Sequence, residues 1–268
     1  METAEVLRLL QDVAAEVITP RFRSLRSGQV HEKNPGDLVT VADHEAEERI
    51  TEALLAAYPG AVVLGEEASA ADPTLHDRFV AADHAFTVDP VDGTKNFVHG
   101  SPDHAVMVAE LLHGVVQRSW IWQPQHLTAY VAERGRGAFR DGMQIFRPTP
   151  SPVPREWRGV TSRRAWVGRE LPGLRPLELT WVCCGVDYPQ LVRGYADVVI
   201  YARTQAWDHA PGSLLLTEAG GFVGTVDGQP YDPRRRSAGG GLVAAARREV
   251  YDTVTQLLGS EVSAADPM

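Results

Sequence analysis

The segment that most constrains this chain is an apolar run that leads directly into two aspartates and a glycine. Phe86-Thr87-Val88 predicts a buried strand, and Asp89-Pro90-Val91-Asp92-Gly93-Thr94-Lys95-Asn96-Phe97 follows it. A strand in this position brings Asp89 to a tight turn, with Asp92 close behind at the same strand end. Two carboxylates placed in this way can converge on one or two hard cations, and Mg²⁺ prefers oxygen ligands. The segment therefore predicts a divalent-cation site at the end of a strand.

The residues after Asp92 are suited to an anion. Gly93 has no side chain to block an approaching anion, and Gly93 and Thr94 offer backbone N–H groups at the predicted start of a helix. A cation beside such amides indicates phosphoryl chemistry, which depends mainly on charge neutralisation and positioning. The same residues also suit an ordinary Asp-Gly turn with an Asn cap. The segment matches neither an EF-hand loop nor the aspartate-x-aspartate signature of aspartyl-phosphate enzymes.

Three other acidic positions follow the same logic. Glu66 follows a short apolar run, Asp43 stands three residues after Thr40 at a helix start, and Asp208 opens a helix predicted over 207–219. Each also has an ordinary structural interpretation: a polar loop for Glu66, a capping box for Thr40 and Asp43, and a helix-dipole partner for Asp208. Taken singly, each position fits its structural interpretation. A shared site is inferred because all of these acidic segments occur in one chain.

Hydrophobic periodicity predicts a mixed chain. Helices are expected over 6–17, 43–58, 207–219 and 247–258. Strands are expected over 61–64, 86–88, 105–112, 115–122, 129–132, 177–184, 196–201 and 242–246. We expect a single domain over 1–268, with subdomains 1–146 (metal-binding motifs) and 160–268 (substrate side) joined by the proline-rich segment 147–159. Strands and helices in both halves favour a layered α/β architecture.

The charge distribution excludes several classes of protein. The 268 residues carry 26 Lys and Arg against 35 Asp and Glu, and the whole net charge of −9 lies within residues 1–77. A nucleic-acid polymer or an anionic membrane needs a basic surface, so neither partner is expected. The adjacent Cys183 and Cys184 form no disulfide framework, and neither a signal peptide nor a membrane span is visible. We therefore expect a cytoplasmic protein.

Together the acidic segments resemble the inositol monophosphatase family of Mg²⁺-dependent, lithium-sensitive phosphatases. The similarity covers essentially the whole chain and is carried by Gly36-Asp37-Leu38-Val39-Thr40-Val41-Ala42-Asp43, Leu64-Gly65-Glu66-Glu67, Val88-Asp89-Pro90-Val91-Asp92-Gly93-Thr94-Lys95-Asn96-Phe97, and Trp207-Asp208-His209-Ala210-Pro211-Gly212 with Glu218-Ala219-Gly220-Gly221. The resemblance implies the αβαβα sandwich shared with fructose-1,6-bisphosphatases, two to three Mg²⁺ ions in each active site, and a homodimer.

The resemblance also implies a role for each site residue. One Mg²⁺ would be held by Glu66, Asp89 and the Val91 carbonyl, a second by Asp89, Asp92 and Asp208, and a weaker third by Glu66 with waters. The catalytic residues would be Asp43, Thr94 and Glu66, with Asp43 and Thr94 polarising the attacking water. The phosphate would contact Gly93 and Thr94. The substrate side would include Asp92, Gly185, Asp187, Tyr201 and Asp208. Residues expected near the site are Lys33, Glu67 and Lys95.

One position departs from the family pattern. Members that hydrolyse inositol phosphates carry a glutamate seven residues before the aspartate of the Trp-Asp motif, and Tyr201 occupies this position. A phenol can donate or accept a hydrogen bond but is not a carboxylate. Asp187 either supplies the missing acid or caps the helix that follows it, and the sequence supports both. Arg234-Arg235-Arg236 either contacts a second phosphate or forms a solvated loop.

We expect a Mg²⁺-dependent phosphomonoesterase that uses a metal-activated water on a small phosphate ester, with an inositol monophosphate as the first candidate. No covalent intermediate is required, and no Gly-x-Ser-x-Gly or Cys–His arrangement is present for one. Histidinol phosphate, 3′-phosphoadenosine 5′-phosphate and fructose 1,6-bisphosphate are the alternative substrates. A non-catalytic regulatory or interaction module on the same fold is the alternative of another class.

Overall fold

The computed structural model describes residues 1–26, 28–34, 37–235 and 241–264, and contains two main sheets. The larger has seven strands in the order β3-β4-β5-β6-β7-β8-β9. Their bounds are Val62–Gly65, His84–Asp92, Ala105–Leu112, Val115–Gln123, Thr128–Glu133, Gly137–Arg140 and Met143–Ile145. The β3–β4 pair is parallel and the other pairs are antiparallel. The expected strands 61–64, 86–88, 105–112, 115–122 and 129–132 all lie in this sheet.

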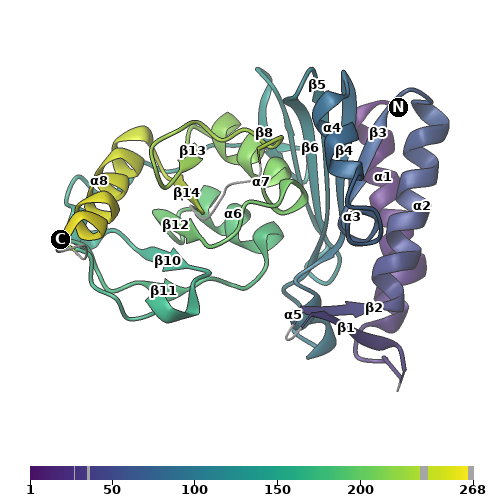
Figure 1. The fold of residues 1–268 in the computed structure, drawn as a ribbon, viewed down its shortest axis with the longest axis horizontal. Helices are drawn as coiled ribbons and strands as arrows, with labels where there is room; N and C mark the ends of the chain where they lie inside the picture. Colours follow the sequence, from purple (N-terminus) through teal and green to yellow (C-terminus); the bar gives the residue numbers. More distant parts are fainter. Residues whose placement is uncertain (27, 35–36, 236–240, 265–268) are drawn as a thin grey trace.

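Two helices, α1 (Thr3–Val13) and α2 (Val41–Ala57), cover the outer face of the large sheet (Figure 1). Helix α1 continues as a π turn over Ala14–Ile18 and a 3₁₀ turn over Thr19–Arg21. The apolar stripe that predicted the first helix packs with α2 against Phe86 and Trp120 of the sheet, and these side chains are fully buried. Burial of this stripe supplies most of the stability of such a helix.

The second sheet has five strands in the order β11-β10-β12-β14-β13. In that order they span Glu178–Leu179, Gly159–Thr161, Val198–Tyr201, Leu242–Ala245 and Phe222–Thr225. Strands β10, β11 and β12 are parallel to one another, whereas β13 and β14 are antiparallel. The short connection 147–159 carries the chain from the first sheet to the second, and we retain it as the proposed boundary between the subdomains.

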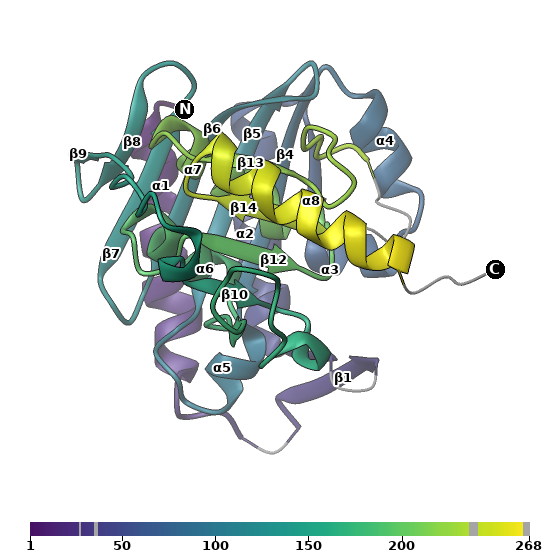
Figure 2. The same cartoon turned by 90° about the vertical axis from the view of Figure 1, so that its left-hand side faces the viewer.

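Helices α6 (Cys184–Val192) and α7 (Ala206–Glu218) lie between the two sheets, and α8 (Arg248–Ala264) covers the far face of the smaller sheet (Figures 1 and 2). The order of layers is therefore αβαβα, as expected. One hydrophobic core surrounds α6 and α7, and another joins the smaller sheet to α8. The remaining elements are α3 (Glu66–Ala71), α4 (Leu75–Ala81), α5 (Thr94–Val98), the hairpin β1 (Val30–Asn34) and β2 (Asp37–Thr40), and 3₁₀ turns at Pro154–Glu156 and Arg164–Trp166.

The strand predicted over 177–184 is wrong in most of its length. Only Glu178–Leu179 is a strand, and Cys184 begins α6. Val182 adopts a positive φ of 60°, which turns the chain before the helix. Tyr188 and Leu191 are then buried with helical spacing, a pattern hidden by the apolar run that precedes them. None of the described helices combines the length and apolar character that a membrane span requires.

Candidate active site

Three carboxylates from two distant parts of the chain converge at the centre of the molecule. Asp89 and Asp92 end β4, whereas Asp208 lies in the first turn of α7. One oxygen from each lies within 4.8 Å of the others. Asp89 and Asp92 are 1% and 8% exposed. The turn motif and the Trp-Asp motif therefore meet, as the sequence predicts.

An irregularity in β4 explains how Asp89 and Asp92 reach the same site. Side chains three positions apart in a regular strand point to opposite faces. Asp89 pairs with Met107 and Asp92 with Ala105, so β4 uses three steps where β5 uses two. The extra residue turns both carboxylates toward one side. Pro90 falls inside this interval and lacks the N–H group that a regular ladder would use.

The side chain of Asp92 is held from the α6 side. Its Oδ2 accepts hydrogen bonds from the Cys183 thiol at 3.0 Å and from the Gly185 N–H group. A Cβ on Gly185 would lie 3.2 Å from the same oxygen and 2.5 Å from the Ala105 side chain, so this approach requires glycine. Asp92 is thus oriented by the start of α6.

One carboxylate oxygen of Asp89, Oδ1, is buried and lacks a hydrogen-bond partner among the described residues. Burial, followed by repulsion from Glu66, Asp92 and Asp208, raises the pKa of Asp89 well above the ordinary value. Burial and the neighbouring Asp92 and Glu66 likewise raise the pKa of Asp208. Ionised carboxylates this close require a cation between them, and oxygen-only ligands suit Mg²⁺. The residues therefore fit the expected metal.

Asp43 and Thr94 lie beside this cluster. The Thr94 hydroxyl lies 3.2 Å from Asp43 Oδ1 and 3.0 Å from the Val91 carbonyl, and it can donate to either. Asp43 Oδ2 accepts from the Thr40 N–H group at 2.9 Å, which is the capping box expected from the sequence. Burial raises the pKa of Asp43 to about 7, although the Thr40 hydroxyl opposes the shift. Asp43 thus caps α2 and also faces the cluster through Thr94.

Glu66 and Glu67 begin α3, directly after β3. Glu66 lines a cavity of about 350 Å³ together with Asp208. Glu67 is buried beside Glu47, a residue that the sequence analysis missed. The Glu47 carboxylate accepts the N–H groups of Glu67 at 2.8 Å and Ala68 at 2.7 Å and so caps α3. The sequence does contain a sign that Glu47 is buried: it lies one turn after Asp43, on a helix face that is otherwise apolar.

A second cavity of about 650 Å³ adjoins the carboxylates, and Gly93, Thr94 and Lys95 form part of its wall. Gly93 has a positive φ of 82° and precedes α5, so its N–H group and that of Thr94 lie at the start of that helix. Because α5 has only five residues, it contributes little helix dipole, and the Gly93 N–H group hydrogen-bonds to the Asp92 carboxylate.

The substrate-side residues Gly185, Asp187 and Tyr201 are buried near the same cavity, and the last two line it. Asp187 lies inside α6 rather than before it, so the expectation that it caps a following helix is wrong; its Oδ1 accepts the Trp181 N–H group at 2.8 Å and ties the preceding loop to α6. The Tyr201 hydroxyl is buried without a hydrogen-bond partner among the described residues, and its ring stacks on Tyr188 with 5.4 Å between ring centroids.

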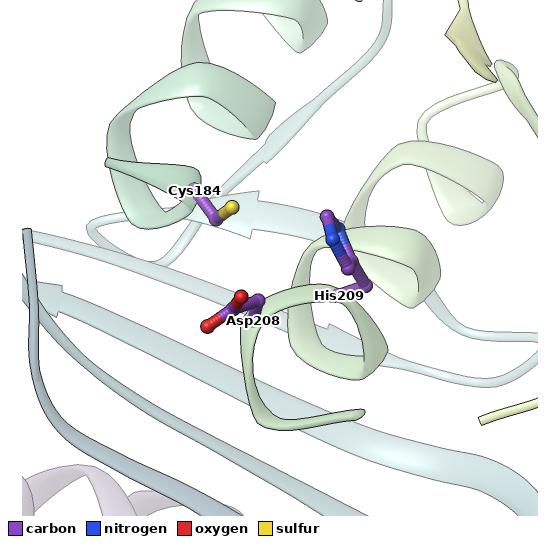
Figure 3. Close-up of side chains that lie close together, drawn as sticks. All are labelled: Cys184, Asp208 and His209. Carbon is purple, nitrogen blue, oxygen red and sulfur yellow. The ribbon is translucent and has the colours of Figure 1, made fainter. Parts of the chain in front are cut away.

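Cys184, Asp208 and His209 lie close together (Figure 3), and all three line the second cavity. His209 Nδ1 is 3.1 Å from the Tyr188 hydroxyl, and the ring also hydrogen-bonds to the backbone of Arg203. Burial lowers the pKa of His209 to about 3, so the imidazole is neutral. Because its ring nitrogens are engaged by protein groups, His209 orients neighbouring segments rather than binding a cation. The sequence analysis did not assign this role.

Lys33 and the arginine run 234–236 were also singled out from the sequence. Lys33 belongs to β1, but its side chain lies outside the described residues. Arg234 forms an ion pair with Asp232 at 3.1 Å, and Arg235 lines the smaller cavity. Arg236, the third arginine of that run, is outside the described residues.

A model of the inositol monophosphatase family matches residues 1–262. The chain belongs to the inositol monophosphatase family. An inositol-1-monophosphatase of Mesorhizobium japonicum is 33% identical over 230 residues, which are 80% of this chain and 82% of that protein. The Nus factor SuhB of Pseudomonas aeruginosa is 29% identical over 231 residues, again 80% of this chain and 82% of the relative.

The solved structure of a Thermotoga maritima IMPase superposes with a TM-score of 0.79 at 23% identity and covers 97% of this chain and 98% of that one. The family match and this superposition confirm the family and the layered fold that the resemblance implied. As a member of the inositol monophosphatase family, the chain is a phosphatase.

Proposed function

We propose that the chain is a Mg²⁺-dependent phosphomonoesterase that hydrolyses a small phosphorylated metabolite. The observation that carries the proposal is the convergence of Asp89, Asp92 and Asp208 around the unpartnered Asp89 oxygen. An inositol monophosphate is the first candidate substrate, because relatives that share most of this chain's length are named inositol-1-monophosphatases. Histidinol phosphate, 3′-phosphoadenosine 5′-phosphate and fructose 1,6-bisphosphate remain the alternatives.

The residues that would hold two to three Mg²⁺ ions are Glu66, Asp89, Asp92, Asp208 and the Val91 carbonyl. A bound Mg²⁺ lowers the pKa of water and neutralises phosphate charge. Asp43 and Thr94 provide the proton pathway of the protein itself: the Thr94 hydroxyl accepts a proton from water and passes its own to Asp43. A pKa of about 7 leaves Asp43 able to hold that proton near neutral pH. The N–H groups of Gly93 and Thr94 bind the phosphate.

The decisive experiment is a phosphate-release assay with Mg²⁺, with and without lithium. The panel contains myo-inositol 1-phosphate, histidinol phosphate, 3′-phosphoadenosine 5′-phosphate and fructose 1,6-bisphosphate. Asp89→Asn and Asp208→Asn keep the shape of each side chain but remove a charge, so we expect release to fall to background in both variants while circular dichroism stays unchanged. Full turnover in either purified variant would overturn the proposal.

A non-catalytic role is the competing outcome, and a relative named as a Nus factor gives it a concrete form. A wild-type protein that binds Mg²⁺ but releases phosphate from no ester in the panel would favour that role. The intact set of carboxylates favours catalysis, because a binding module has no need for a buried, unpartnered carboxylate oxygen.

We also propose a homodimer. Strand β9 is the edge of the seven-stranded sheet, and Met143 within it and Phe146 just after it are 70% and 68% exposed. Exposed apolar side chains beside an open sheet edge suit an interface with a second copy. Light scattering on the purified chain tests this, with twice the chain mass of 29.3 kDa as the expected result.

A further inference from the structure

Two arginines lie on the wall of the large cavity, in the smaller-sheet half of the molecule. Arg164 lies just beyond the end of β10, and Arg203 just beyond the end of β12. These strands are parallel, with Thr161 opposite Ile200, so both loops leave the sheet at the carboxyl ends of their strands, on the same side of the sheet. Ligands in α/β folds bind at the carboxyl ends of parallel strands. Arg203 also lines the smaller cavity beside Asp208.

The two loops that carry these arginines are joined to each other. The Ala202 N–H group donates to the Ser162 hydroxyl at 2.9 Å, and the Ser162 N–H group donates to the Ile200 carbonyl at 3.1 Å. The Arg203 backbone is held in turn by His209, which Tyr188 orients from the buried core. Hydrogen bonds from the backbone therefore hold the two loops against each other, whereas both arginine residues are exposed.

The charge of the cavity wall leaves these arginines available to an anion. In the part of the chain that the structure describes, neither Arg164 nor Arg203 forms an ion pair within 4.0 Å of a carboxylate, although Arg203 attracts the Asp208 carboxylate at longer range. Tyr201 lines the same wall and carries a phenol rather than a carboxylate, so no negative charge competes at that position. Asp187, another acid of this cavity, is 1% exposed, and its Oδ1 accepts the Trp181 N–H group. Asp92 and Asp208 belong to the proposed cation site.

We propose that Arg164 and Arg203 form a second anion-binding subsite, which makes the preferred substrate a phosphomonoester with a further phosphate or carboxylate group. This inference rests on the proposed phosphatase function and narrows its substrate class. A guanidinium group pairs with either anion in bidentate geometry. Among the candidate substrates, those with two anionic groups fit this wall better than a singly phosphorylated polyol does.

Matched esters separate the second anion from the rest of the substrate. Fructose 1,6-bisphosphate is compared with fructose 1-phosphate, and 2-phosphoglycerate with glycerol 2-phosphate, which replaces the carboxylate by a hydroxymethyl group. We expect kcat/KM to be at least about 10-fold higher for one doubly charged ester than for its partner, because a charge-assisted hydrogen-bond pair contributes that much. The pair that shows the preference identifies the second anion as phosphate or carboxylate.

The variants Arg164→Gln and Arg203→Gln test the assignment. We expect each to reduce the ratio of the two kcat/KM values toward one, mainly through a higher KM for the doubly charged ester. A ratio cancels losses common to both esters, such as weaker Mg²⁺ binding or partial unfolding. Arg155→Gln is the matched control, since Arg155 is exposed in the 3₁₀ turn at Pro154–Glu156 and lines none of the described cavities.

The outcomes distinguish the two proposals. Phosphate release from both members of each pair with equal kcat/KM would overturn the subsite and leave the phosphatase function intact. A preference that survives in both arginine variants would assign the second anion elsewhere and also overturn it. Absence of release from every ester, with Mg²⁺ bound, would overturn the phosphatase function and the subsite together.

Discussion

At the scale of single residues, Thr94 connects the carboxylate cluster to Asp43. Its hydroxyl is within hydrogen-bond distance of Asp43 and of the Val91 carbonyl. Thr94→Ala removes that hydroxyl, and we expect kcat to fall by about 10²–10⁴-fold, the usual contribution of a positioned proton-transfer group. Steady-state kinetics at saturating Mg²⁺ measure the change.

Thr94→Ser is the control for this prediction, because it keeps the hydroxyl and removes only a methyl group. We expect it to retain kcat within about 10-fold of the wild type. Equal kcat values for the alanine and serine variants would contradict a role for the hydroxyl and leave Thr94 as a structural residue of α5.

Gly185 shows how a residue without a side chain can orient a functional one. An added Cβ would lie 2.5 Å from the Ala105 side chain and 2.8 Å from Met107 Sδ, both of which are buried in β5. Gly185→Ala should therefore destabilise the protein by about 1–3 kcal/mol, as overpacking does, and should weaken Mg²⁺ binding because Asp92 loses its donor geometry. Urea unfolding and Mg²⁺ titration measure the two effects.

Gly60→Ala provides the comparison, since nothing lies within 4 Å of a Cβ at Gly60 and its backbone is unstrained. We expect its midpoint in urea to match that of the wild type closely. Equal urea midpoints for Gly185→Ala and Gly60→Ala would contradict the prediction that a Cβ at position 185 overpacks the contact between α6 and β5.

At the scale of elements, local sequence patterns predicted that a strand would precede the two aspartates, but not its full length or its irregularity. The strand expected over 86–88 extends to His84–Asp92 in the structure, so the two aspartates lie within β4 rather than after it. Its irregularity was not predictable, because register depends on pairing with β5. The long strand expected over 177–184 failed for a similar reason: an apolar run cannot be distinguished from a buried helix start by periodicity alone.

The capping of α3 by α2 is another contact between elements that local patterns cannot reveal. Glu47→Ala removes the acceptor of two N–H groups at the start of α3. We expect a loss of about 2–4 kcal/mol in the free energy of unfolding, because both donors are left without a charged partner. Glu66 should also lose its position, so the apparent Mg²⁺ affinity should fall. Denaturant unfolding and Mg²⁺-dependent activity report the two losses.

Glu48→Ala is the matched control, since Glu48 is the exposed neighbour on the same helix. A surface change of this kind is expected to alter stability by less than about 0.5 kcal/mol. Similar unfolding curves for the Glu47 and Glu48 variants would show that α3 does not depend on Glu47.

At the scale of the whole molecule, the site belongs to both halves. Strand β4 supplies Asp89 and Asp92, and α7 supplies Asp208 from the layer between the sheets. The sequence predicted these members because each motif is short and its residues are chemically distinctive. It could not predict the supporting contacts, in which Cys183 donates to Asp92, Glu47 caps α3 and His209 pairs with Tyr188, because those contacts join residues far apart in the chain.

Because several carboxyl groups are buried, the stability of the whole fold should decrease as the pH rises toward neutrality. Burial raises the pKa of Asp43 and of Glu47 to about 7, above ordinary values of 3.8 and 4.5. The folded state therefore binds more protons than the unfolded state up to about pH 7, and stability decreases as these protons are lost. His104 and His209, with pKa values lowered to about 4 and 3, act in the opposite direction, and their effect fades as the unfolded histidines lose their protons between about pH 6 and pH 8.

In EDTA, we expect Asp43 and Glu47 together to lower the free energy of unfolding by about 1–2 kcal/mol between pH 6.5 and pH 8, and the two histidines to offset part of this fall. The remaining fall corresponds to a decrease of at most a few degrees in Tm. Mg²⁺ should reduce the decrease, because a cation that binds only the folded, ionised site stabilises it by mass action. Differential scanning calorimetry with EDTA or Mg²⁺ measures both effects. A Tm in EDTA that stayed constant or rose over this interval would mean that the raised carboxyl pKa values are wrong, and the case for a cation-dependent site would lose its electrostatic basis.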